Sequence, residues 1–307
     1  MTISGLIPIH PLTLVPNFRV GTNVYLWNDK TGSAVKFLAS EQIVSESIFS
    51  FMLANPNQKV FVEDTSHQSY FEYLVEHMAG WLVEPRIPRI LKTAVMIEYV
   101  QGQFSKAFEH KSIQSLLRSS IDCSRILTHL GHHIQLNGRE LQRTLRHDCG
   151  FVTHAVNTTF YSYLIAEHQG YCEEMVSEIC AGAMLHDIGK IEMNGTLRND
   201  QSHPTEGFRM LCREPGVTET HLMVCYQHHE RPDGKGFPVG LLGDEIQIAS
   251  RICAVANRFD GLTSERADRP AMTRLAALRV LESEKNTALD MEVTKCLEQK
   301  MSQTSTI

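Results

Sequence analysis

The chain has 307 residues, of which 42% are hydrophobic, and this is enough for two domains and a substantial core. Its net charge of -6 at pH 7 provides no basic surface for a duplex, so we exclude long nucleic acid and expect any nucleotide ligand to be small. Eight cysteines without a C-x-x-C pair indicate reduced, buried thiols of a cytoplasmic protein. Residues 1–16 have no basic stretch, and no apolar run approaches the roughly 18 residues that cross a membrane, so export and membrane insertion are disfavoured.

Residues 1–85 predict a small α+β domain with a regulatory or interaction role. The pattern predicts a β-hairpin, a helix, a third strand and a second helix, at residues 20–26, 34–38, 40–53, 59–63 and 70–82. This segment has no cluster of metal-ligand residue types, so His67 and His77 are expected at the surface. A sensory or partner-binding role and a simpler packing or dimerisation role fit this pattern equally well.

Residues 86–145 predict a helical linker, because apolar side chains recur there at helical spacing. Its long helices could also pair two chains into a homodimer. The sequence Gly131-His132-His133 has no further metal-ligand residue at a spacing typical of a metal site. We therefore interpret His132 and His133 as solvent-facing histidines near a helix end.

From residue 146 onward, histidine and aspartate recur at the ends of predicted helices. His154 lies in a helical pattern of apolar side chains, and a helix over 173–186 ends in the sequence His186-Asp187-Ile188-Gly189-Lys190. We expect Gly189 to adopt the left-handed turn that ends a helix. A third helix opens with His203-Pro204, since proline suits the first turn.

Two further helices complete this pattern. A helix over 218–227 ends in His228-His229-Glu230, and a helix over 244–262 carries Asn257 and Asp260, three residues apart on one face.

These residues predict a metal centre. Burial of five histidines and an aspartate without partners would be costly, whereas divalent cations satisfy imidazole and carboxylate together. The side chains outnumber the positions of one open catalytic site, so two metals are favoured, with Asp187 as a bridge. The alternative is a set of separate structural histidines, which the ordered succession of these pairs disfavours. The candidate ligands are His154, His186, Asp187, His203, His228 and His229.

A loop at 231–238 follows the His-His pair and contains two glycines and two prolines. Its Arg231 and Lys235 bring positive charge beside the predicted metals. A structural turn is the alternative, but the position directly after His228-His229 favours a loop that faces substrate.

Residues 146–285 resemble the HD-GYP family, the HD-superfamily phosphohydrolases that hydrolyse the bacterial second messenger cyclic di-GMP. The matching motifs, in family order, are His186-Asp187-Ile188-Gly189-Lys190, His203-Pro204-x-x-Gly207, His228-His229-Glu230, Asp233-Gly234-x-Gly236-Phe237-Pro238 and Ala256-Asn257-Arg258-Phe259-Asp260-Gly261. The resemblance implies a mainly α fold, with an all-helical HD-type domain at 146–307 and a metal centre of iron or, as second choice, manganese. It assigns ligand roles to the same six residues and a phosphate-facing or proton-donating role to Lys190.

The sequence departs from the family at several positions. Phe237 replaces the tyrosine of the G-Y-P signature, and Asn257 replaces a metal-binding aspartate, for which Asp260 could compensate. Asp268 stands where the family has an aromatic ring, and the connection at 191–202 is short. Gly150 stands where three-metal members carry glutamate, which favours two metals.

The prediction is therefore a metal-dependent phosphodiesterase that converts cyclic di-GMP to pGpG or GMP. Asp187 and Lys190 are the candidate catalytic residues, and the metal set comprises the six ligands with Asn257 and Asp260. The candidate phosphate contacts are Lys190, Arg231, Lys235, Arg266 and Arg269. The alternatives are a metal-containing effector that binds a cyclic dinucleotide or a signalling protein with little turnover, and an enzyme for another phosphomonoester or nucleotide.

Overall fold

The computed structural model describes residues 4–55, 58–148, 150–191, 201–266 and 268–303. The chain divides into two compact units. The first comprises Met1–Gly102, His133–Gln135 and Glu140–Thr144, and the second comprises Gln103–His132, Leu136–Arg139 and Leu145–Ile307. The predicted fold class, mainly helical with a small N-terminal sheet, is confirmed. None of the described helices has the length and apolar composition of a membrane span.

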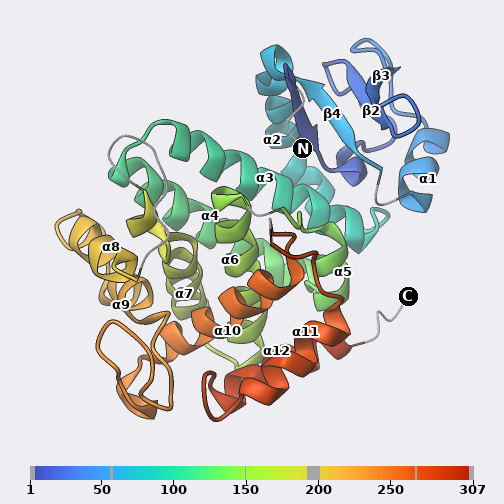
Figure 1. Ribbon diagram of the computed structural model, residues 1–307. Coiled ribbons are helices and arrows are strands. Elements are labelled where there is room, and N and C mark those ends of the chain that lie inside the picture. Colours follow the sequence, from blue (N-terminus) through green and yellow to red (C-terminus); the bar gives the residue numbers. More distant parts are fainter. Residues whose placement is uncertain (1–3, 56–57, 149, 192–200, 267, 304–307) are drawn as a thin grey trace. The chain divides into compact units, whose positions relative to one another are not determined.

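The sheet of the first unit is antiparallel, with the strand order β1-β4-β2-β3 (Figure 1). Its strands are β1 (Leu6–Ile9), β2 (Val24–Asn28), β3 (Ser33–Leu38) and β4 (Val60–Glu63). The predicted hairpin is confirmed as β2 and β3, in which Leu26 faces Val35. The sequence does not predict β1, because this strand is short and contains Pro8, which a sheet tolerates at an edge such as this one.

The helices of the first unit are α1 (Glu46–Ala54), α2 (His67–Val83), the first two thirds of α3 (Arg89–Glu109) and most of α5 (Gly138–Thr144). Helix α1 begins six residues later than predicted because Ser45 caps it, with its Oγ accepting the Ile48 N–H at 3.3 Å. Buried hydroxyls attach the 3₁₀ turn η1 (Pro11–Thr13) to α2. The Tyr73 hydroxyl donates to the Thr13 carbonyl at 3.1 Å, and the Val15 N–H donates to that hydroxyl at 3.2 Å.

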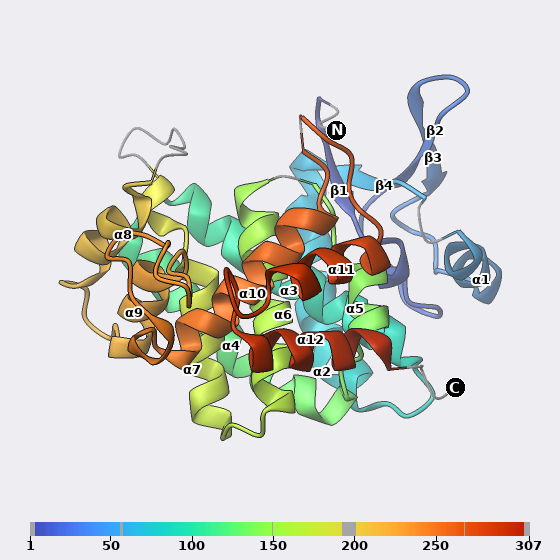
Figure 2. The ribbon, with the colours of Figure 1, turned by 60° about the horizontal axis from the view of Figure 1, so that its bottom comes forward.

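The second unit is helical. Its helices are α4 (Ile113–Ile134), α6 (Phe151–His168), α7 (Glu173–Leu185), α8 (His203–Leu211), α9 (Glu219–Gln227), α10 (Ile248–Thr263), α11 (Arg274–Glu284) and α12 (Met291–Ser302). Helix α6 packs against α7, α10 and α12 (Figure 2). Most of its side chains are buried. This central helix therefore supplies a rigid support for side chains that project toward α7 and α10.

The cysteines differ in exposure more than the sequence indicates. All the described cysteines are unpaired, and four of them are buried. Cys172 and Cys212 are exposed, so the prediction of burial is wrong for these two, which lie at the ends of α7 and α8. Cys149 lies outside the described residues.

Candidate metal centre

The six candidate ligands lie on four helices or directly after them. His154 is on α6, His186 and Asp187 follow the end of α7, His203 is the first residue of α8, and His228 and His229 follow the end of α9. They form two groups that could each hold a metal ion. One group contains His154, His186 and Asp187, and the other contains Asp187, His203, His228 and His229.

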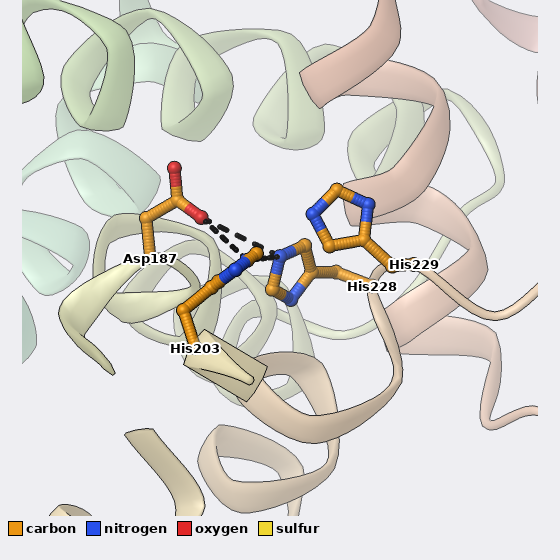
Figure 3. A group of neighbouring side chains, drawn as sticks. All are labelled: Asp187, His203, His228 and His229. Atoms are coloured by element: carbon orange, nitrogen blue, oxygen red, sulfur yellow. Dashed lines mark hydrogen bonds and ion pairs between the residues drawn. The ribbon is translucent and has the colours of Figure 1, made fainter. Parts of the chain in front are cut away.

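Asp187 belongs to both groups and presents a different oxygen to each. Its Oδ2 lies 3.4 Å from Nε2 of His186 and 3.7 Å from Nε2 of His154. Its Oδ1 lies 3.2 Å from Nε2 of His203 and 3.5 Å from Nε2 of His228 (Figure 3). The carboxylate is buried, so both oxygens are held in place by the surrounding helices.

The backbone sets the tautomers of two of the histidines. Nδ1 of His186 lies 2.7 Å from the carbonyl oxygen of Ala183, and Nδ1 of His228 lies 2.9 Å from that of Cys225. A carbonyl oxygen only accepts, so each Nδ1 carries the proton and each Nε2 keeps a lone pair. The Nε2 atoms of His203 and His228 are 3.2 Å apart, so this lone pair of His228 points at a second imidazole nitrogen.

Two buried polar atoms show that this arrangement suits cations. Nε2 of His186 and Oδ1 of Asp187 are buried and have no hydrogen-bond partner within the described part of the chain. Each such atom costs about 1–3 kcal/mol if it stays unpaired. Imidazole nitrogens together with a carboxylate are donors that iron, manganese and zinc accept. The residues therefore fit a centre of two divalent cations.

The protonation states also suit metal binding. Burial lowers the pKa of His228 to about 4, and it lowers the pKa values of His186 and His229 as well. Burial alone would raise the pKa of Asp187, but the neighbouring imidazoles, His186 first, outweigh it and hold this pKa well below its usual range. At neutral pH His186, His228 and His229 are thus neutral imidazoles beside an ionised carboxylate.

Asp260 supports the centre from outside both groups. Its Oδ2 lies 2.6 Å from Nδ1 of His154, and its Oδ1 accepts hydrogen bonds from Asn157 at 2.7 Å and from Ser264 at 3.1 Å. Burial would lower the pKa of His154, but the hydrogen bond and charge of Asp260 raise it. Asp260 belongs to neither group of neighbouring ligand atoms, and its contact orients His154, whose Nε2 is left to face Asp187.

Two asparagines, Asn257 and Asn157, lie close to Asp260 in the sequence or in the structure. Asn257 is half-buried on α10, one turn before Asp260. Sequence reasoning misses Asn157, although a polar residue three positions after His154 in an apolar helix lies on the same face and is a usable signal.

Glycines allow the elements of the centre to approach closely. A Cβ on Gly189 would overlap the carbonyl oxygen of His203 and would lie 2.5 Å from the Gly207 nitrogen. Gly189 lies in the 3₁₀ turn η3 (Ile188–Lys190) and lacks a positive φ, so the predicted left-handed turn is wrong. Its role is to let η3 contact the start of α8, which brings His203 to Asp187.

The loop after α9 is held together by Glu230 and packs onto the centre through Phe237. The buried Glu230 carboxylate accepts hydrogen bonds from the N–H groups of Val239 at 2.7 Å, Gly240 at 3.0 Å and Leu241 at 2.9 Å. The Phe237 ring stacks on His229 with 4.6 Å between centroids and 19° between planes. Sequence reasoning assigns no role to Glu230, which anchors the whole loop.

The basic side chains predicted to contact substrate have different partners. Arg231 donates to both oxygens of Asp233, at 2.9 and 2.7 Å. Arg269 donates to the carbonyl oxygens of Gly261 and Leu262, at the last turn of α10. These two guanidinium groups are therefore engaged in local structure.

Three other basic side chains belong to the predicted phosphate contacts. Nζ of Lys190 lies 2.5 Å from Oδ2 of Asp187 and so contacts the centre directly. Lys235 and Arg266 are exposed. The short connection at 191–202 falls mainly on 192–200, which lie outside the described residues.

A helical domain with a His-Asp pair at one helix end and further histidines on three other helices has the architecture of the HD-type phosphohydrolases. Residues 142–293 match the family described as HD domain, so this part of the chain belongs to that family. The resemblance to the HD-GYP group is likewise confirmed by its relatives.

Two relatives and one solved structure illustrate the similarity. The chain is 36% identical over 140 residues to the cyclic di-GMP phosphodiesterase response regulator RpfG of Xanthomonas campestris pv. campestris. This match covers 41% of this chain and 37% of RpfG. It is 31% identical over 150 residues to the 3'3'-cGAMP-specific phosphodiesterase 3 of Vibrio cholerae serotype O1. That match covers 45% of this chain and 33% of the relative. The match thus spans less than two fifths of each relative.

The fold has a counterpart over nearly the whole chain. Bd1817, an HDG"Y"P protein from Bdellovibrio bacteriovorus, superposes with a TM-score of 0.67 and covers 97% of this chain and 100% of that one. At 16% identity this likeness establishes the fold alone.

Proposed function

We propose that the HD domain is a metal-dependent phosphodiesterase that hydrolyses cyclic di-GMP to pGpG or GMP. The observation that carries this proposal is the buried Asp187 carboxylate, whose two oxygens each face a separate set of imidazole Nε2 atoms. The names of the relatives support a cyclic dinucleotide as the substrate class.

In this proposal, His154, His186 and Asp187 hold one divalent cation, and Asp187 holds the second with three further histidines. Iron is the first choice and manganese the second, and Asn257 offers an additional neutral oxygen. The cations, when bound, supply a Lewis acid that neutralises charge on the phosphate and activates water. The three further histidines are His203, His228 and His229.

The protein's own groups position the substrate and move protons. The Lys190 ammonium, held at Asp187, can donate a proton to the ribose oxygen that leaves the phosphorus or can pair with a phosphate oxygen. Lys235 and Arg266 are the exposed cations left to meet the second phosphate of a cyclic dinucleotide. Phe237 covers one face of His229 and keeps water from that side of the ring.

One observation favours the second candidate, an effector that binds a cyclic dinucleotide and turns it over slowly. Arg231 and Arg269 are already engaged by Asp233 and by backbone carbonyls, so two predicted phosphate contacts are not free. Phe237 also lacks the hydroxyl that a tyrosine would offer to a ligand.

One experiment separates these candidates. Purified protein loaded with iron or manganese is incubated with cyclic di-GMP, 3'3'-cGAMP and a nucleoside monophosphate, and the products are resolved by chromatography. We expect pGpG or GMP from cyclic di-GMP, and we expect Asp187→Ala to lose both bound metal and turnover. The control Asp244→Ala, whose side chain is fully exposed, should keep both. Tight binding of cyclic di-GMP without product would support the effector. Full metal content together with full activity in Asp187→Ala would refute the proposed mechanism.

A further inference from the structure

The first unit contains a cavity of about 840 Å³ that no part of the proposed reaction uses. This volume is within the range of sites for small organic ligands, about 300–1,000 Å³. Residues after η1, the start of α1, the C-terminal half of α2 and the start of α3 line it, and all of them belong to the same unit. The cavity is therefore a property of this unit by itself.

One wall of the cavity is aromatic and tightly packed. The ring centroids of Phe18 and His77 are 4.7 Å apart at 89°, and those of Phe18 and Trp81 are 5.2 Å apart at 80°. Tyr73 supports this wall, because its ring packs on Trp81 and its hydroxyl accepts the Val15 N–H. Such edge-to-face packing keeps the rings in position before any ligand arrives.

The polar groups at the cavity are mainly acceptors. Glu84 and Arg86 form an ion pair and so offset each other. Glu46 is exposed, and its hydrogen bond is a long one of 3.4 Å to the Asn17 amide. Within the described residues, no lysine or arginine lies within ion-pair distance of Glu46.

The other two acceptors are on α2. The Glu76 carboxylate is exposed and lies 3.9 Å from Nδ1 of His77. That Nδ1 lies 3.0 Å from the carbonyl oxygen of Tyr73, so it carries a proton and leaves Nε2 as an acceptor. A ligand at this cavity thus meets two carboxylates and an imidazole lone pair.

We propose that this cavity binds a small organic cation with an apolar or aromatic body. Aromatic rings attract cations, and the unneutralised carboxylates favour positive charge over negative. The apolar body would cover the Phe18 and Trp81 wall, and the charged end would face Glu46 and Glu76. An anion of the same size would meet the exposed Glu46 and Glu76 carboxylates instead.

Gly80 provides a steric test of this site. It lines the cavity from helix α2, and a Cβ placed on it meets no atom within 4 Å. Gly80→Leu should therefore place an aliphatic side chain in the cavity beside Trp81, with no clash at its Cβ. Gly80→Ala is the matched control, because it leaves most of the space open and improves helix propensity.

The experiment uses the full chain with Trp27→Phe, which leaves Trp81 as the sole tryptophan. Benzyltrimethylammonium is titrated while Trp81 fluorescence is recorded, and phenylacetate and benzyl alcohol serve as the anionic and neutral counterparts. We expect a saturable change with the ammonium, binding at least about tenfold weaker for phenylacetate, and about threefold weaker ammonium binding in each of Glu46→Gln and Glu76→Gln. Calorimetric titration of the same samples detects binding even if the fluorescence of Trp81 does not change.

The variants at Gly80 complete the test. Gly80→Leu should lose binding while its thermal unfolding stays at the parent temperature or above, and Gly80→Ala should bind as the parent does. The proposal is overturned if the ammonium does not bind at millimolar concentration by either method, if phenylacetate binds as well, or if Gly80→Leu binds normally. Binding of a lysine-rich peptide without binding of the ammonium would equally overturn a small-molecule site. None of these readouts depends on phosphodiesterase activity.

Discussion

Replacement of Gly189 by alanine tests whether close contact between η3 and α8 assembles the metal centre. The new Cβ would overlap the His203 carbonyl oxygen and lie 2.5 Å from the Gly207 nitrogen, and an ordinary contact is about 3.5 Å, so the two elements must separate by at least about 1 Å. Metal–ligand distances tolerate about 0.2 Å. Because His203 leads α8, this separation moves its Nε2 from Asp187, now 3.2 Å away.

We therefore expect Gly189→Ala to bind one cation or fewer per chain and to lose at least about 100-fold in turnover. Metal content is measured by mass spectrometry after desalting, and unfolding is followed by circular dichroism. An overpacked site costs about 1–3 kcal/mol, so the fold should persist at a reduced melting temperature. Gly80→Ala, where a Cβ meets open space, should keep two cations. Two cations and parental turnover in folded Gly189→Ala would show that this contact does not position His203.

Further predictions concern the residues around the centre and the last helices. Asp260→Asn should weaken metal binding about 10–100-fold in a chelator competition, because His154 loses the carboxylate that orients it; unchanged affinity would contradict this role. Glu230→Ala should lower the free energy of unfolding by about 1–3 kcal/mol in urea, since part-buried N–H groups lose their acceptor, and a loss below about 0.5 kcal/mol would show that the loop holds without it. Burial and the neighbouring Glu282 raise the pKa of Glu298 to about 7 from an ordinary 4.5, so the folded state binds this proton more tightly and loses stability as pH rises from 4.5 through 7. Glu298→Gln should therefore raise the melting temperature relative to the parent at pH 8 and not at pH 5, and an equal change at both values would contradict this assignment.

The sequence predicts the elements well where a local signal decides them. The β2–β3 hairpin follows from turn residues between β-rich runs, and α8 follows from proline in its first turn. The start of α1 is less predictable, because the residues from 40 onward also have helical spacing and only the capping bond of Ser45 selects the true start. Strand β1 escapes prediction since its pairing partner, β4, is more than 50 residues away.

The centre shows the same division between local and tertiary information. The spacing of His, Asp and Pro along the chain predicts which side chains gather, and the structure places these six in two groups. The spacing of Asn257 and Asp260 shows only that they share a helix face, so it does not distinguish a ligand from the residue that orients His154. Glycine is required at 189 because the backbone of α8 lies against it, which the sequence around Gly189 does not show. In the same way, the role of Arg269 depends on carbonyl groups at the end of α10.

The positions at which α7 and α9 stop have a consequence for how this chain can vary. Consecutive side chains of a continuous helix diverge by about 100°, so neighbours such as His186 and Asp187 would not face the same point. Here α7 ends at Leu185 and Asp187 has φ -99° and ψ 10°, outside helical geometry, which redirects its side chain. The length of each helix is therefore as constrained as the identity of the side chains beyond it. One residue inserted within α7 or α9 would turn a correct set of ligands away from the centre.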